Sequence, residues 1–126
     1  MLMLDTDVMI DVQRKHANAV AWFRSLKELP LLPGYVLMEL IQDAPNKHNV
    51  NAVLKLVKPM SIVWCGSADC DQALNWFVKF HLSDNLGLLD SLISACAVGR
   101  DADFCTFNTK HYRVIPGLRL VQPYER

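Results

Sequence analysis

Acidic side chains occur at three places in this sequence where their neighbours are apolar. Asp5 directly follows the apolar run MLML, Glu39 lies inside VLMELI, and Asp90 begins DSLISACAV. An ionised aspartate in surroundings like those of Asp90 needs a helix cap, a cation or a metal to offset its desolvation. Glu39 lies at the edge of the apolar arc of its helix, from which it can face a cleft. These acids are candidates for a cation site, with an N-cap for Asp90 and a solvated charge for Glu39 as the alternatives.

The first acid belongs to a D-T-D motif that comes after an expected strand. In open parallel sheets the functional crevice lies outside the carboxyl ends of the strands, so Asp5 is expected to face that crevice. Asp7 stands directly before Val8, and an aspartate there is a natural N-cap that accepts backbone N–H bonds. Asp11, four residues further on, is expected on a solvated helix face.

Short apolar runs alternate with helical patterns along the chain, and this alternation must position the acids. Apolar residues within 8–26 recur at steps of three and four, which predicts one or two helices. Two helices separated by Pro45-Asn46 follow the second apolar run, another passes through 73–78, and the run 89–98 reads as a buried helix. The expected strands are MLML, PLLP, SIVWC, DFCTF and, as a possible fifth, LRLVQP.

This pattern predicts an α/β fold in one domain spanning residues 1–126. Strands that alternate with helices favour a parallel sheet, here of four to five short strands, flanked by helices on both faces. A chain of 126 residues has the length of one ordinary domain. The sequence contains neither an internal repeat nor a low-complexity linker that would divide it.

Composition excludes several function classes. The 13 basic side chains balance 13 acidic ones, which argues against a general electrostatic grip on polyanions. No signal peptide or membrane-length apolar run is visible, so we expect a cytoplasmic protein. The four cysteines form no C-x-x-C pair and are expected to be reduced packing residues rather than zinc ligands with His48, His81 or His111. The four cysteines are Cys65, Cys70, Cys96 and Cys105.

The acidic motifs, taken in order, resemble those of a known family. The stretches MLMLDTDVMID, LMELIQ, LGLLDSLISACA and TFNTKHYRVIPGL are similar to the successive motifs of the PIN-domain family, and most similar to VapC-type toxin ribonucleases of type II toxin–antitoxin systems. The resemblance runs nearly end to end. It implies that Asp5, Glu39, Asp90 and Asn108 are catalytic and that the three acids among them bind a metal.

The same resemblance implies an activity and partners. We expect an endoribonuclease that uses Mg²⁺ or Mn²⁺ to hydrolyse RNA, because such a metal neutralises the phosphate and lowers the pKa of water. Thr6 could hydrogen-bond to a metal-bound water or to phosphate, and Thr6, Asp7 and Asp43 are candidates for residues just outside the ligands of the metal. The family also implies a small antitoxin protein as a partner and a homodimer, and the lack of a membrane-length apolar run argues against a membrane partner. Four basic residues could form a phosphate-binding rim, but for each of them we favour the alternative of a solvated surface charge: Lys47, Lys110, Arg113 and Arg119.

Some positions depart from the family pattern. Pro33 and Val36 stand in a stretch where members often carry hydroxyl residues, and Asp43 stands where a glycine commonly follows the glutamate motif. Asn108 is neutral, so three acids remain and the number of metals, one or two, stays open. The roles of Asn108 and Asp43 also stay open.

Three other interpretations are kept. A haloacid-dehalogenase-type phosphatase also begins with a strand and D-x-D, but it wants Thr or Val where this chain has Met9, and no later acid pair follows an apolar strand. A PIN nuclease of RNA processing and a catalytically weak PIN binding module share the fold. Metal-dependent cleavage of RNA, tested beside hydrolysis of a simple phosphate ester, separates nuclease, phosphatase and binding module.

Overall fold

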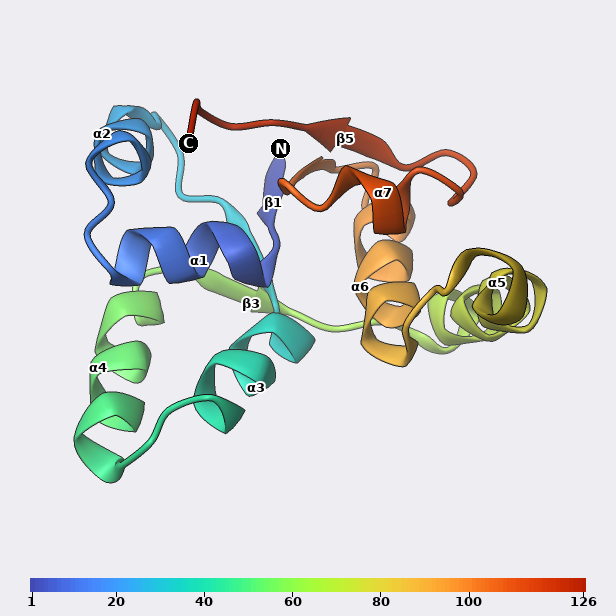
Figure 1. The fold of residues 1–126 in the computed structure, drawn as a ribbon, viewed down its shortest axis with the longest axis horizontal. Coiled ribbons are helices and arrows are strands. Elements are labelled where there is room, and N and C mark those ends of the chain that lie inside the picture. Colours follow the sequence, from blue (N-terminus) through green and yellow to red (C-terminus); the bar gives the residue numbers. More distant parts are fainter.

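Five short strands form one parallel sheet at the centre of the computed structural model, which describes all 126 residues (Figure 1). The strand order is β3-β2-β1-β4-β5, and every neighbouring pair is parallel. The α/β fold predicted from the sequence is therefore confirmed, with the fifth strand present. The strands are β1 (Leu2–Leu4), β2 (Leu31–Pro33), β3 (Ser61–Val63), β4 (Asp103–Cys105) and β5 (Arg119–Val121).

Seven helices connect these strands. The apolar periodicity within 8–26 belongs to two helices, which separate where the His16 ring nitrogen accepts a hydrogen bond from the Ala19 amide and caps the second one. The four-residue α7 was not predicted, because one helical turn is too short to show a 3.6-residue period. The helices are α1 (Thr6–Gln13), α2 (Ala17–Ser25), α3 (Gly34–Gln42), α4 (Lys47–Val57), α5 (Ser67–Asp84), α6 (Leu88–Gly99) and α7 (Thr109–Tyr112).

The strand order explains how the helices divide between the two faces. The chain moves outward from β1 through β2 to β3 and then returns past β1 to β4. Because parallel crossovers are right-handed, reversing the direction of travel moves the connecting helices to the opposite face. Figure 1 shows α1 to α4 on one side of the strands and α5 to α7 on the other. No helix is both long and apolar enough to cross a membrane.

The core is built around β1 and β4. Met3, Leu4 and Phe104 are fully buried in a cluster of 17 buried residues that reaches helices of both faces. Leu4 pairs with Cys105 in the parallel register, so the residue after each of them leaves the sheet at the same edge. Asp5 and the segment after β4 are therefore held side by side by two buried strands. All four cysteines are free thiols, as expected.

Candidate active site

Asp5 lies where β1 ends and α1 begins, and it is 6% exposed. It is the N-cap of α1, since its Oδ1 accepts a hydrogen bond from the Thr6 amide at 2.8 Å. Its Oδ2 accepts a second bond from the Thr106 hydroxyl, also at 2.8 Å. Burial, with the nearby charge of Asp7, raises the pKa of Asp5 from 3.8 to about 7 in spite of these bonds. Two hydrogen bonds thus hold the Asp5 carboxyl in place, although burial makes its ionised form less favourable.

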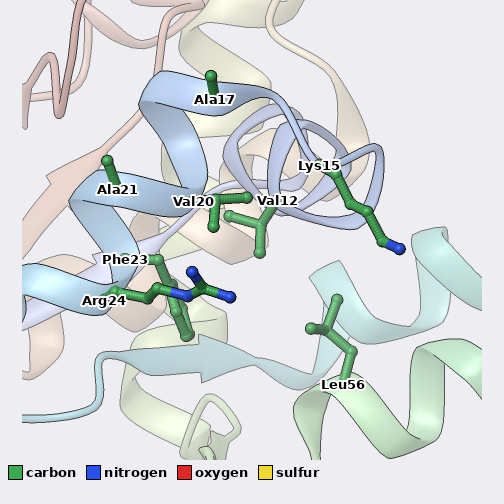
Figure 2. Close-up of a pocket in the computed structure, with 8 residues that line it drawn as sticks. All are labelled: Val12, Lys15, Ala17, Val20, Ala21, Phe23, Arg24 and Leu56. Carbon is green, nitrogen blue, oxygen red and sulfur yellow. The ribbon is translucent and has the colours of Figure 1, made fainter.

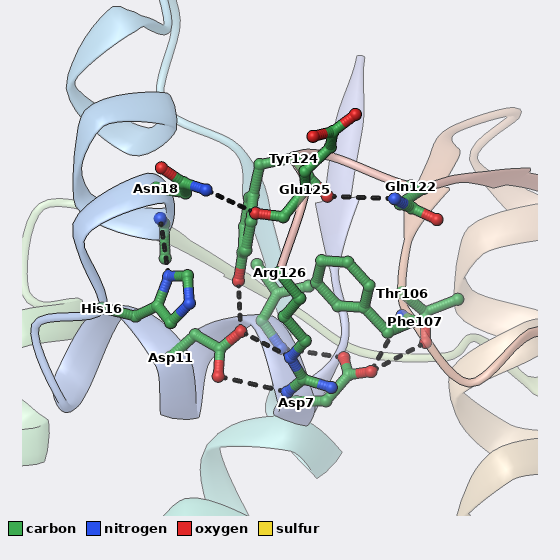
Figure 3. A network of polar contacts seen from close by, with 12 residues as sticks. Asp7, Asp11, His16, Asn18, Thr106, Phe107, Gln122, Tyr124, Glu125 and Arg126 are labelled. Atoms are coloured by element: carbon green, nitrogen blue, oxygen red, sulfur yellow. Dashed lines mark hydrogen bonds and ion pairs between the residues drawn. The ribbon is translucent and has the colours of Figure 1, made fainter.

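Asp7 does not cap α1, so the capping prediction was wrong. The helix begins at Thr6, directly after the strand, and the capping position therefore falls on Asp5. Asp7 lies in the first turn, where its Oδ2 accepts a hydrogen bond from the Phe107 amide at 2.8 Å (Figure 3). This contact ties the start of α1 to the segment that follows β4.

Glu39 enters from α3, the helix that follows β2. Its Oε1 accepts a hydrogen bond from the Thr6 hydroxyl at 2.9 Å, so the second residue of the D-T-D motif holds the glutamate. Burial raises the pKa of this half-buried carboxyl, with a smaller contribution from the charge of Asp90. Glu39 faces the other acids and is not a freely solvated helix charge.

Asp90 is the third residue of α6, whose N-cap is Gly87. Its Oδ1 lies 3.2 Å from the hydroxyl of Tyr112, and its Oδ2 lies 3.6 Å from Nδ1 of His111. Asp90 is therefore not the N-cap of α6, and that alternative is wrong. The Tyr112 hydroxyl also lies 3.3 Å from Oδ1 of Asp5, between the two carboxylates. Sequence reasoning missed Tyr112, because a tyrosine in KHYRV has no signal that distinguishes it from an ordinary core aromatic.

A pocket of about 220 Å³ gathers most of the predicted site residues. Asn108 lies at its exposed rim, before α7. Asp43 lies elsewhere, as the exposed C-cap of α3 on a separate hollow. The residues that line the acidic pocket are Asp5, Thr6, Asp7, Ile10, Glu39, Asp90, Asn108 and Tyr112.

The donor set of this pocket fits a hard divalent cation. Its lining includes four carboxylates, an amide and two hydroxyls, and no cationic side chain. No three His, Cys, Asp or Glu side chains stand close enough to hold a metal directly. Magnesium typically takes only one or two carboxylates and completes its shell with water and substrate phosphate. The acidic pocket therefore suits an ion that is partly hydrated.

One expectation about a charged residue outside the pocket was wrong. Asp11 is 8% exposed and not solvated: its Oδ2 accepts from the Tyr124 hydroxyl at 2.7 Å and from Nε of Arg126 at 2.9 Å (Figure 3). The reason is that the segment after β5 returns over α1. Arg119 is the exposed surface charge that we favoured: it pairs with Asp101 and Asp103 at the amino end of the sheet, opposite the acids, and not at a phosphate-binding rim.

A larger hollow of about 590 Å³ lies between α1, α2 and α4 (Figure 2). It shares no residue with the acidic pocket and is mostly apolar, with Lys15 and Arg24 as its charged side chains. It contains no carboxylate, thiol or imidazole that could perform hydrolysis. Size alone therefore does not identify a site, and the smaller acidic pocket is the one of these two that has carboxylates able to take part in hydrolysis.

A known protein family and several solved structures are similar to this chain. The sequence profile of the family described as PIN domain matches residues 2–115. No curated protein sequence matches the chain. Among solved structures, the chain is similar to a toxin–antitoxin complex from Klebsiella pneumoniae, with a TM-score of 0.81 and 21% identity over 100% of both chains.

Two further solved structures are similar to the chain. VapBC2 from Rickettsia felis, bound to a DNA fragment from its promoter, has a TM-score of 0.80 and 20% identity over 95% of this chain and 96% of that one. Mycobacterium tuberculosis VapC20, described as a Sarcin-Ricin loop cleaving toxin, has a TM-score of 0.72 and 15% identity over 90% and 95%. At these identities the likeness shows a shared fold.

Proposed function

Because the chain belongs to the PIN-domain family, we propose that it is a metal-dependent endoribonuclease and the toxin of a VapBC-type toxin–antitoxin pair. The observation that carries this proposal is the meeting of Asp5, Glu39 and Asp90 in one small pocket. They come from three elements far apart in sequence, and their like charges oppose the apo fold. Burial raises the pKa values of Asp5 and Glu39, and acids brought together at such a cost mark a functional site.

The proposed roles follow from each residue's contacts. Asp5, Glu39 and Asp90 would hold a partly hydrated Mg²⁺ or Mn²⁺, directly or through its waters. The bound ion would neutralise the phosphate charge and lower the pKa of water. Thr6 orients Glu39 through its hydroxyl. Asn108, on the exposed rim, would donate its amide N–H to a phosphate oxygen of the substrate.

RNA is the proposed substrate, and the support is the description of the similar M. tuberculosis structure as a toxin that cleaves the Sarcin-Ricin loop. The test uses purified protein free of any partner, a labelled RNA hairpin and an all-deoxy strand of the same sequence, with Mg²⁺, with Mn²⁺ and with EDTA. We expect cleavage of the RNA in either metal, none in EDTA, and little cleavage of the deoxy strand. Cleavage after metal removal would refute the metal mechanism, and equal cutting of both strands would refute the RNA assignment.

An antitoxin is the proposed protein partner. The support is that the similar structures from K. pneumoniae and R. felis are described as a toxin–antitoxin complex and as VapBC2. The product of a gene adjacent to this one should bind the protein and suppress RNA cleavage at equimolar concentration. A neighbouring product that binds without affecting cleavage would contradict the toxin role and leave the nuclease assignment intact.

We also propose a homodimer that uses α5. Leu74, Val78 and Leu82 recur every fourth residue and are 60%, 75% and 93% exposed, which makes an unpartnered apolar row on one face of this helix. Light scattering should give twice the chain mass. The double substitution Val78→Lys with Leu82→Lys should give a monomer, while Gln72→Lys on the same helix should remain dimeric. A monomeric wild-type protein would refute the proposal.

A further inference from the structure

Tyr112 has a buried hydroxyl in contact with two carboxylates. The residue is 1% exposed, and its ring packs edge-on against Phe104 of β4 with centroids 5.0 Å apart. Its oxygen lies 3.3 Å from Oδ1 of Asp5 and 3.2 Å from Oδ1 of Asp90. Because the ring is fixed in the core, the hydroxyl cannot turn to bulk water, and the two acids are its only side-chain partners.

The chemistry of a phenol limits what this contact can do. A tyrosine hydroxyl has one proton, so it donates to one carboxylate at a time and presents lone pairs to the other. It therefore cannot neutralise two ionised acids. It can fix their positions, because both oxygens lie within hydrogen-bonding distance of one immobile atom.

The two acids depend on this hydroxyl to different degrees. Asp5 is also held by the Thr6 amide and by the Thr106 hydroxyl, both at 2.8 Å. The Asp90 side chain is 26% exposed, and its other neighbour is the half-exposed ring of His111 at 3.6 Å. Without the phenol, Asp5 would stay in place and Asp90 would be free to rotate towards solvent.

We propose that Tyr112 is a positioning residue that holds Asp90 at a fixed place relative to Asp5 and so prepares the pocket for a divalent cation. This inference rests on the proposed metal-dependent function. Residues that orient metal ligands typically contribute 10- to 100-fold to metal affinity. Tyr112 is thus expected to act on metal affinity more than on the rate at saturating metal.

The chain offers a matched control for the test. Tyr124 also donates its hydroxyl to a buried aspartate, Asp11, at 2.7 Å, but it lies outside the acidic pocket. Tyr112→Phe and Tyr124→Phe each remove one hydroxyl and keep the ring. Any general effect of losing a tyrosine hydroxyl that is bonded to an aspartate appears in both variants, whereas an effect on the acidic pocket appears only in Tyr112→Phe.

The experiment is calorimetric titration of Mn²⁺ into the wild-type protein and both variants. We expect Tyr112→Phe to bind Mn²⁺ 10- to 100-fold more weakly and Tyr124→Phe to stay within two-fold of wild type. The Mn²⁺ concentration for half-maximal RNA cleavage should shift by the same factor, with the rate at saturating Mn²⁺ within a few-fold. Equal Mn²⁺ affinity of wild type and Tyr112→Phe, or an equal loss in both variants, would overturn the inference alone.

A second variant covers the case in which Tyr112→Phe does not fold. A methyl group at Gly87 would lie 2.9 Å from Oδ2 of Asp90, so Gly87→Ala pushes this carboxylate aside while the tyrosine stays intact. It should also weaken Mn²⁺ binding by at least ten-fold, and wild-type affinity would overturn the inference. Wild-type protein that binds no Mn²⁺ would instead refute the proposed metal site itself.

Discussion

The raised pKa of Asp5 predicts how the stability of the metal-free protein depends on pH. Below pH about 4 this carboxyl is neutral in both the folded and the unfolded chain. Between about 4 and about 7 it ionises in the unfolded chain and stays neutral in the folded one, so the folded state binds more protons. The free energy of unfolding therefore falls as pH rises through this window and does not change further above it. Asp5→Asn removes this dependence.

The size of this loss of stability follows from the rise in the pKa of Asp5 from 3.8 to about 7. One pKa unit corresponds to about 1.4 kcal/mol, so full ionisation costs the folded state on the order of 4 kcal/mol. Asparagine keeps an oxygen that can accept from the Thr6 amide and remains a good N-cap. For a domain of this size the Asn variant should melt about 10 to 15 °C higher than wild type at pH 8, and close to wild type at pH 4.

The assay is urea denaturation of both proteins in EDTA from pH 4 to pH 8, with the difference in unfolding free energy plotted against pH. Asp11→Asn is the control of opposite sign. Burial would raise the pKa of Asp11, but hydrogen bonds from Arg126 and Tyr124 outweigh it and lower the pKa. Its stabilising contribution is present above about pH 4 and is lost as pH falls. A difference between wild type and Asp5→Asn that does not vary with pH, or that favours wild type at pH 8, would refute the reasoning.

Three further variants test other contacts of the pocket. Asp90→Asn should be as stable as wild type without metal, or more stable by about 1 kcal/mol, and should gain far less stability than wild type across a Mg²⁺ series; an unchanged Mg²⁺ response in thermal melts would contradict this. Asp7→Ser should lose about 1 to 3 kcal/mol in urea denaturation, because serine cannot reach the Phe107 amide, whereas wild-type stability would show that this bond contributes nothing. Thr6→Val should weaken Mn²⁺ binding several-fold in calorimetry by releasing Glu39, and unchanged affinity would mean that Glu39 needs no such support.

Much of the fold could be predicted from the sequence, because local patterns determine it. Alternating apolar runs and helical periods indicated the parallel sheet, and the place of Asp5 at the end of an apolar run put it at the functional edge. Periodicity could not predict that Glu39 and Asp90 would lie at that edge. That prediction rested on the family resemblance of their motifs, since a single sequence does not show which helix faces which strand end.

Two of the features that sequence reasoning missed depend on partners that are distant in the sequence. Asp11 is buried because Tyr124 and Arg126 return over α1, and nothing near Asp11 indicates this. Tyr112 reads as a core aromatic, and its ring is one, but the partners of its hydroxyl depend on where α7 lies relative to the end of β1 and to α6. The capping error at Asp7 has a local cause, because D-T-D offers two possible caps and only the end of β1 decides between them.

The most direct test of the central claim compares acids inside and outside the pocket. RNA cleavage in saturating Mn²⁺ is measured for Asp5→Asn, Glu39→Gln and Asp90→Asn beside Asp43→Asn, with circular dichroism to confirm the fold of each. Asp43 is the matched control, because it follows Glu39 on the same helix but lies outside the acidic pocket. We predict at least a hundred-fold loss of rate for each of the first three variants and a rate within a few-fold of wild type for Asp43→Asn. Folded variants of the three acids that still cut RNA at the wild-type rate would contradict the claim that this pocket is the active site.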